Sequence, residues 1–245
     1  MVDDVLAKSF ERTGADYDRF RPGFPSAAAE LLLPARVGAV LDLGAGTGKF
    51  TEQLMGRADR VLAVEPAGAM LDVLRAKLPD VEAHQAGAER MPLPDASVDA
   101  VSVAQAFHWF DREPACAEIA RVLVPGGTLG LLWNHSDPEC AWDRAAHRIA
   151  HPAVAEDDGT TESAADDLPG FVFVRRCALR WSERISRADY LGRWSTVSTL
   201  LVADDATRAE MTGAIESILD LDPETAGHEE FLLPLITDLF LYRRV

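Results

Sequence analysis

The sequence predicts an α/β protein in which a seven-stranded, mostly parallel sheet carries helices on both faces and a helical cap. Short apolar runs alternate along the chain with segments that have apolar residues at helical spacing, a pattern typical of parallel sheets with right-handed crossovers. One of these runs ends at Asp42 and continues directly into the glycine-rich turn of residues 44–48. Another run ends at Glu65, about twenty residues farther along, as in nucleotide-binding α/β folds. Together these observations predict a Rossmann-like core.

Apolar runs predict the strands, and the segments between them predict the helices. Residues 66–78 and 113–123 have apolar side chains at helical spacing. A further helix is predicted directly after the glycine-rich turn, from about residue 48 to 54, another over residues 140–150, and two or three within residues 186–231. The predicted strands cover residues 40–43, 61–64, 81–83, 98–103, 128–133, 171–181 and 238–242.

This pattern divides the chain into three parts. We expect residues 1–33 to form an N-terminal helical cap segment, residues 34–133 the cofactor-binding Rossmann-like core, and residues 134–245 the remaining strands with helical cap insertions. In open α/β sheets ligands bind at the carboxyl ends of the strands, so the cap is expected over that edge. Residues 156–167 contain six acids and no base. Because these acids lack a recognisable ligand spacing, we interpret the stretch as a solvated, mobile loop rather than a metal site.

Composition restricts the function classes. A length of 245 residues suits one α/β domain with an added cap. The formal net charge of −16 argues against a nucleic-acid substrate, since Lys and Arg normally supply that binding. The three cysteines show no Cys-x-x-Cys spacing, so free thiols and no metal are expected. The N-terminus lacks the features of a signal peptide, and no run approaches transmembrane length. We expect a cytoplasmic monomer or homodimer that acts on a small molecule and binds neither nucleic acid nor membrane.

The glycine-rich turn predicts a cofactor site. Gly44, Gly46 and Gly48 permit positive φ and leave room for a ligand, and the carboxylate of Glu65 can accept hydrogen bonds from both hydroxyls of a ribose. Asp42 favours S-adenosylmethionine over a dinucleotide, because a pyrophosphate above the glycines would face like charge, whereas S-adenosylmethionine carries an ammonium and a sulfonium. The glycine spacing also differs from Gly-x-Gly-x-x-Gly. The less favoured alternatives are an NAD-dependent oxidoreductase and a strand–helix connection that only needs small residues.

In these residues the chain resembles the class I S-adenosylmethionine-dependent methyltransferases, specifically the type 11 group that acts on small molecules. The segment Val64-Glu65-Pro66, followed by Met70, is similar to the family's ribose-binding segment. Residues 87–95 resemble its adenine-side loop. The resemblance implies that Pro66, Met70, Ala88 and Glu89 contact the cofactor, and that the last strand is antiparallel.

Two narrower signatures resemble the branch of trans-aconitate and related carboxyl methyltransferases. They are residues 17–25, which begin Tyr17-Asp18-Arg19-Phe20-Arg21, and residues 104–110 around His108. One position departs from the family, which usually has an acid facing the adenine where this chain has Gly87. Adenine recognition is therefore expected to depend on backbone groups near Ala88 or on another side chain.

Methyl transfer from a sulfonium is an in-line displacement, so the main task of the enzyme is to hold donor and acceptor close and collinear. His108 is the candidate catalytic residue; it acts as a base, or it only hydrogen-bonds the backbone between aromatic walls. Gln105 is expected at the methionine end of the cofactor, and Arg21 at its carboxylate or in closure of the lid. The candidate acceptor-binding residues are Tyr17, Trp109, Trp133, Asn134 and Trp194.

The acceptor is the least determined part of the prediction. A carboxylate approaching an acidic protein needs local positive potential, and six arginines lie between Arg175 and Arg193, of which one or two are expected to bind it. We predict S-adenosylmethionine-dependent methyl transfer to a small molecule, preferably O-methylation of a carboxylate, with S-adenosylhomocysteine as product. The alternatives are methylation of a hydroxyl, amine or carbon in secondary metabolism, and a non-catalytic nucleoside-binding module.

Overall fold

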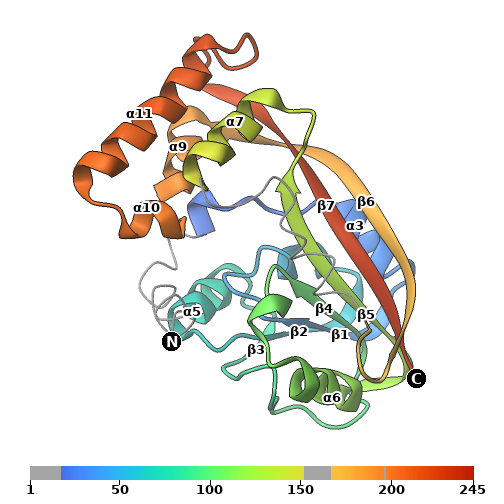
Figure 1. Cartoon of the computed structure of the whole chain (residues 1–245). Helices are drawn as coiled ribbons and strands as arrows, with labels where there is room; N and C mark the ends of the chain where they lie inside the picture. The colour runs from blue at the N-terminus through green and yellow to red at the C-terminus, as the bar shows by residue number, and fades with distance from the viewer. Residues whose placement is uncertain (1–17, 152–166, 196) are drawn as a thin grey trace.

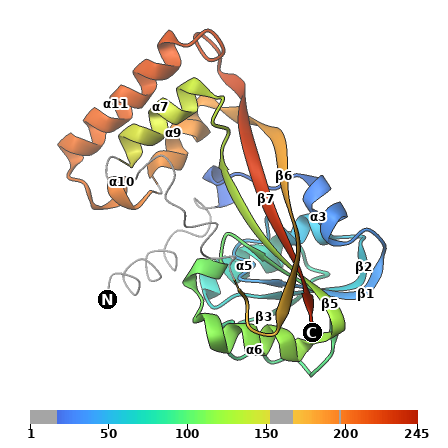
Figure 2. The ribbon, with the colours of Figure 1, turned by 45° about the vertical axis from the view of Figure 1, so that its right-hand side comes forward.

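The computed structural model describes residues 18–151, 167–195 and 197–245, which form one seven-stranded sheet with helices on both faces (Figures 1 and 2). The strand order is β3-β2-β1-β4-β5-β7-β6. Neighbouring strands are parallel except β7, which runs antiparallel to both β5 and β6. This arrangement confirms the predicted fold class. The strands are β1 (Val37–Leu43), β2 (Ala58–Val64), β3 (Glu82–His84), β4 (Val98–Ala104), β5 (Leu123–Ser136), β6 (Phe171–Ser186) and β7 (Glu230–Arg244).

The last three strands are longer than the apolar runs predicted, with 14, 16 and 15 residues in β5, β6 and β7. Their outer ends leave the central sheet and reach the cap (Figures 1 and 2). Leu233 and Leu235 of β7 are buried there in a separate apolar cluster. In β6 exposed positions outnumber buried ones, so its sequence has too little continuous apolar character to mark the full strand.

The helices match the predicted segments with one correction. α5, α6 and α7 lie at the three segments predicted as helices, and three helices lie between the last two strands. The helix after the glycine-rich turn begins at Thr51, not near residue 48, because Gly48 has φ +86°, outside the right-handed helical region. No helix in the described parts of the chain has the length and apolar character to cross a bilayer. The helices are α3 (Ser26–Leu32), α4 (Thr51–Leu54), α5 (Gly68–Lys77), the 3₁₀ helix η1 (Phe107–Trp109), α6 (Arg112–Val122), α7 (Ala141–Ala150), α9 (Arg187–Ser195), α10 (Ser198–Val202) and α11 (Asp205–Leu221).

The buried apolar side chains of the described residues form three clusters. One lies between α6 and one face of the sheet, and the second lies on the opposite face beneath α3 and α4. The third joins α7, α9, α10 and α11 with the outer ends of β6 and β7, beyond the carboxyl ends of the other strands (Figures 1 and 2). α3 falls within the segment predicted as the N-terminal cap, but it packs on the sheet through Ala28, Ala29 and Leu32. Tyr17 and residues 152–166, which include most of the acidic stretch, lie outside the described residues.

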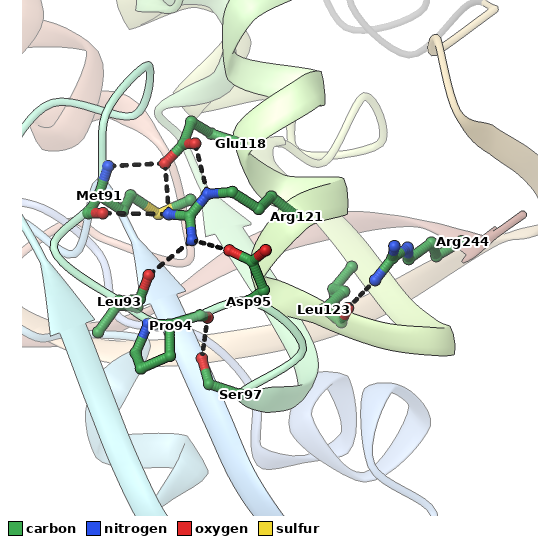
Figure 3. Close-up of polar contacts among 9 residues, drawn as sticks. All are labelled: Met91, Leu93, Pro94, Asp95, Ser97, Glu118, Arg121, Leu123 and Arg244. Atoms are coloured by element: carbon green, nitrogen blue, oxygen red, sulfur yellow. Dashed lines mark hydrogen bonds and ion pairs between the residues drawn. The ribbon is translucent and has the colours of Figure 1, made fainter.

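Arg121 on α6 fixes the end of the loop that resembles the adenine-side loop (Figure 3). Its guanidinium donates to both carboxylate oxygens of Glu118 at 2.7 and 2.8 Å and to Asp95 at 2.7 Å. It also donates to the backbone carbonyls of Leu93 at 2.7 Å and Met91 at 3.2 Å. Because Glu118 accepts the backbone N–H of Met91 at 2.9 Å, the loop is attached to α6 from both directions.

Candidate cofactor and acceptor site

A cavity of about 1080 Å³ lies where the carboxyl ends of β1, β2, β4 and β5 face the cap. The glycine-rich turn and the residues after β2, β4 and β5 line one side of it, and α7 and α9 line the other. Figures 1 and 2 show these two helices together beyond the end of the sheet. The strand order reverses between β1 and β4, which is the position where open α/β sheets bind ligands.

The glycine-rich turn brings backbone to the cavity. Gly44 and Gly46 have φ of +70° and +55° and both line the cavity. A Cβ on Gly44 would lie 2.5 Å from the Cβ of Ala106, so the turn packs too closely for a side chain there. Among the described residues, a Cβ on Gly46 would meet only Sδ of Met70, at 3.8 Å. The space beside Gly46 is therefore open for a ligand.

Glu65 follows β2 and lies against the same turn. Its Oε2 accepts the N–H of Gly46 and its Oε1 accepts the N–H of Ala67, both at 2.9 Å. Burial raises the pKa of Glu65, while these two hydrogen bonds oppose the shift. A carboxylate has about four acceptor positions, so two remain for a ligand in the cavity that Glu65 lines.

Asp42 supports the turn from behind. It is buried, and it accepts hydrogen bonds from Oγ1 of Thr51 at 2.6 Å and from Oγ of Ser102 at 2.8 Å. Burial raises the pKa of Asp42 to about 6, against the opposing effect of the two hydroxyls. Asp42 thus joins β1 to β4 and to the start of α4, and its side chain does not line the cavity.

Gln105 links the ends of β4 and β5. Its φ of +56° is unusual for a residue other than glycine. Its backbone N–H donates to Leu132 at 2.8 Å, and Nε2 donates to the carbonyl of Asn134 at 3.0 Å. Asn134 in turn donates from Nδ2 to the carbonyl of Gly23 at 2.7 Å. These bonds fix the segment that contains Arg21 beside the cavity.

His108 lies on η1 and lines the cavity. Nε1 of the buried Trp133 points to Nδ1 of His108 at 3.5 Å. The ring of Trp109 lies 4.8 Å from the His108 ring, and Trp109 is 45% exposed. His108 is therefore held between a buried indole and an exposed one.

The cavity differs in charge from the whole protein. Among the described lining residues only Glu65 and Asp137 are acidic, against five Lys or Arg. Four histidines add positive charge when they are protonated. The lysine, Lys49, is partly buried, and this burial lowers its pKa. The basic lining residues are Arg21, Lys49, Arg144, Arg148 and Arg193, and the histidines are His108, His135, His147 and His151.

Part of this basic lining was not predicted. Of the six arginines between Arg175 and Arg193, only Arg193 lines the cavity. Four of the others pair with acids: Arg176 with Asp238, Arg180 with Glu139, Arg184 with Glu230 and Arg187 with Asp220. The basic residues of α7 were missed, although their spacing over residues 144–151 places them on one helical face.

The structure brings most predicted site residues to this cavity. Five are elsewhere: Asp42, Gly48, Ala88 and Trp133 are in the protein interior, and Glu89 accepts the backbone N–H of Asp111 at 3.0 Å. Tyr17 lies outside the described residues. Those that line the cavity are Arg21, Gly44, Gly46, Glu65, Pro66, Met70, Gln105, His108, Trp109, Asn134 and Trp194.

Comparison with known proteins identifies the family. A sequence family described as a methyltransferase domain matches residues 41–131. An uncharacterized methyltransferase of Mycobacterium tuberculosis (strain ATCC 25618 / H37Rv) is 38% identical over 232 residues, which cover 95% of this chain and 94% of the relative. The chain belongs to the class I S-adenosylmethionine-dependent methyltransferases.

Two further relatives of this methyltransferase match over nearly its whole length. An uncharacterized methyltransferase of Schizosaccharomyces pombe (strain 972 / ATCC 24843) is 28% identical over 251 residues, which cover 98% of this chain and 99% of the relative. A solved structure from Anaeromyxobacter dehalogenans, a proposed type II methyltransferase, has 29% identity and a TM-score of 0.69, covering 92% of this chain and 97% of that one. The likeness therefore includes the cap as well as the core.

The methyltransferase uses S-adenosylmethionine as its methyl donor, and the cavity fits this cofactor. The open space at Gly46 admits a ligand close to the backbone, and Glu65 presents carboxylate acceptors beside it. At about 1080 Å³ the cavity is at the upper end of the usual size range of small-molecule sites.

Proposed function

We propose that this methyltransferase O-methylates a carboxylate of a small anionic molecule, in the manner of the trans-aconitate and carboxyl methyltransferases that its residues 17–25 and 104–110 resemble. The observation that carries the proposal is the charge of the cavity. Five Lys or Arg and two acids line it, in a protein with a net charge of −16. Local cations of this kind attract an anionic acceptor and orient it through charge-assisted hydrogen bonds.

On this proposal the cofactor lies along the glycine-rich turn. Glu65 accepts hydrogen bonds from the ribose hydroxyls, while Pro66 and Met70 contact the nucleoside. Gln105 and Arg21 bind the methionine end. The adenine is bound by backbone near Ala88, since Glu89 is engaged with Asp111. The helices α7, α9, α10 and α11 act as the cap over the core of residues 34–133 and exclude water.

Methyl transfer to a carboxylate needs little acid–base catalysis. When bound, S-adenosylmethionine supplies an electrophilic methyl group on its sulfonium. A carboxylate acceptor is already ionised at neutral pH, so no proton must leave it. His108 then donates a hydrogen bond from Nε2 to the acceptor, because its Nδ1 faces the N–H of Trp133. Trp109, Asn134 and Trp194 shape the space around the acceptor.

A hydroxyl acceptor is the second candidate, and it is favoured by the presence of His108 in the cavity. In that reaction His108 is the general base that removes the hydroxyl proton. Methylation of an amine or a carbon, and a nucleoside-binding module without transfer, have no comparable observation in their support.

Product analysis tests the proposal. The protein is incubated with S-adenosylmethionine and a panel of mono-, di- and tricarboxylates, hydroxy compounds and amines, and S-adenosylhomocysteine and the methylated acceptor are measured by mass spectrometry. We expect a methyl ester, which mild alkali hydrolyses to methanol. An alkali-stable methyl ether or methylamine contradicts the carboxylate proposal. Tight binding of S-adenosylhomocysteine without transfer to any compound contradicts the enzyme assignment for these acceptors.

A further inference from the structure

The cap side of the cavity is lined by one basic face of α7. Arg144, His147, Arg148 and the C-cap residue His151 follow one another at helical spacing, and all four line the cavity. The opposite face of the helix is anchored, because Trp142, Ala146 and Ala150 are buried in the apolar cluster of the cap. The orientation of the basic face is therefore fixed by packing.

Arg193 of α9 lies beside this face in a defined orientation. Its guanidinium stacks over the rings of Trp194, at 4.8 Å from the centroid, and of Tyr190, at 5.5 Å. Its side chain is 13% exposed and lies 3.6 Å from Asp143, which also accepts the hydroxyl of Tyr190 at 2.7 Å. A guanidinium held in one plane loses little entropy on binding an oxyanion.

The two histidines of the face are packed against each other and against the same tryptophan. The rings of His147 and His151 are stacked, with centroids 4.2 Å apart and an interplanar angle of 22°. Both rings lie edge-on to Trp194, at 6.0 and 6.3 Å. Burial lowers the pKa of His151, and the nearby charges of His147, Arg21 and Arg193 lower it further. These charges favour the neutral ring of His151, and an anion bound beside it would favour the protonated ring instead.

The helix dipole alone explains some of the basic residues at this end of the cavity. Basic residues in the last turn of a helix are stabilised by the helix dipole, and His147 and Arg148 occupy that turn of α7. The dipole does not account for Arg193 and Arg21, which come from other segments and reach the same end of the cavity. This convergence of three segments is the feature that indicates a ligand.

We propose that His147, His151 and Arg193 form an anion-binding subsite that holds a second anionic group of the acceptor, a carboxylate or a phosphate. The proposal depends on the proposed function only in assigning the ligand as the methyl acceptor. The subsite lies on α7 and α9 of the cap, whereas Gly46, Glu65 and Gln105 follow β1, β2 and β4 of the sheet. The group bound by the cap is thus distinct from the group that receives the methyl. The acceptor therefore has at least two anionic groups.

Calorimetry with simple polyanions tests the subsite without measuring activity. The protein loaded with S-adenosylhomocysteine is titrated with citrate, with inorganic pyrophosphate and with acetate. We expect citrate or pyrophosphate to bind more tightly than acetate, and His147→Gln and His151→Gln each to weaken that binding about tenfold, the range for a lost charge-assisted hydrogen bond. Preference for citrate or for pyrophosphate distinguishes a carboxylate ligand from a phosphate ligand.

Arg36→Gln is the matched control, because Arg36 pairs with Asp59 near the amino end of β1 and does not line the cavity. It should bind the polyanions as the unaltered protein does. S-adenosylhomocysteine affinity should stay within about twofold in all three variants, since the subsite is on the other side of the cavity. Equal polyanion binding in the histidine variants, or none in the unaltered protein, overturns the subsite.

Nuclear magnetic resonance gives a second readout. The imidazole pKa of His151 should rise when citrate or pyrophosphate binds, because a nearby anion favours the protonated ring. An unchanged titration at saturating polyanion contradicts the subsite. The two proposals can fail separately. If the histidine variants lose polyanion binding but the protein methylates no carboxylate, the subsite is supported and the proposed function is refuted.

Discussion

The indole nitrogen of Trp133 lies 3.5 Å from Nδ1 of His108. An indole N–H can only donate, so Nδ1 is the acceptor in this pair and the neutral imidazole carries its proton on Nε2. Trp133 is buried in the core and comes from β5, whereas His108 is on η1. A residue of the sheet thereby determines which atom of His108 bears the proton. The nitrogen with the proton is a donor, and it suits a carboxylate acceptor better than a hydroxyl that must lose a proton.

His108→Gln distinguishes the two acceptor classes. With a carboxylate acceptor the variant should keep much of the maximal rate and mainly lose acceptor affinity, because the amide still donates a hydrogen bond. With a hydroxyl acceptor the rate should fall by about 10²–10⁴-fold, the usual contribution of a positioned base. Rates against pH at saturating acceptor make the comparison. A large loss together with a histidine-like limb in the unaltered protein makes His108 the base.

Trp133→Phe tests how His108 is positioned. The variant removes the N–H that faces Nδ1, so both imidazole tautomers should become populated. Nitrogen-15 spectra of labelled histidine measure this directly. Trp181→Phe removes an indole that donates to Thr237 at 2.9 Å, away from His108, and should leave the tautomer unchanged. An identical His108 spectrum in the Trp133 variant means that Trp133 does not determine the tautomer.

Glu65→Ala should weaken S-adenosylhomocysteine binding by about 1.5–3 kcal/mol, the range for lost charge-assisted hydrogen bonds. Glu65→Gln should also weaken it, because the amide has one acceptor oxygen for the two backbone N–H groups of Gly46 and Ala67. Calorimetry measures both affinities. Glu82→Gln, at an exposed side chain outside the cavity, is the control. Unchanged affinity in a folded Glu65→Ala protein rules out the ribose assignment.

Substitution of Gly44 should mainly lower stability, whereas substitution of Gly46 should mainly weaken cofactor binding. Both Gly44→Ala and Gly46→Ala impose positive φ on alanine, at a cost of about 1 kcal/mol. The added Cβ at residue 44 also meets Ala106 at 2.5 Å, so that variant should lose more stability. At residue 46 the Cβ meets no described atom closer than Sδ of Met70 at 3.8 Å, so it should mainly weaken S-adenosylhomocysteine binding. Urea unfolding and calorimetry separate the effects, and full affinity in Gly46→Ala contradicts the cofactor placement.

The sequence was informative where local pattern determines structure. β1 and β2 each end in a continuous buried run, and Glu65 follows one of these runs beside the turn. The sequence was less informative where residues far apart in the chain determine how a side chain is oriented. Asp42 is turned away from the cavity by Ser102, which is sixty positions later in the chain. The basic spacing on α7 is visible in the sequence, but only the packing of Trp142 on Tyr190 and Phe231 directs that face to the cavity.

Asp42 should make the stability of the protein depend on pH. Burial raises its pKa from 3.8 to about 6 in the folded state, so between these values the folded protein binds more protons than the unfolded chain. Unfolding then releases protons, and the free energy of unfolding falls as pH rises through this window, by an amount on the order of 3 kcal/mol. Asp42→Asn cannot titrate and should lack this component.

Urea unfolding between pH 4 and pH 7 measures the difference between the unaltered protein and Asp42→Asn. That difference should shift in favour of the variant as pH rises. Asp238→Asn should show a pH dependence of stability with the opposite sign. Burial alone would raise the pKa of Asp238, but the hydrogen bonds from His135 and Arg176 outweigh burial and lower the pKa. Asp238 therefore stabilises the fold above its ordinary pKa of 3.8, and its contribution is lost as pH falls below that value. The comparison for Asp238→Asn is accordingly extended below pH 3.8. The stability difference between the unaltered protein and Asp42→Asn could instead be constant with pH. That result would show that the pKa of Asp42 is ordinary, because the hydrogen bonds from Thr51 and Ser102 fully offset the effect of burial on it.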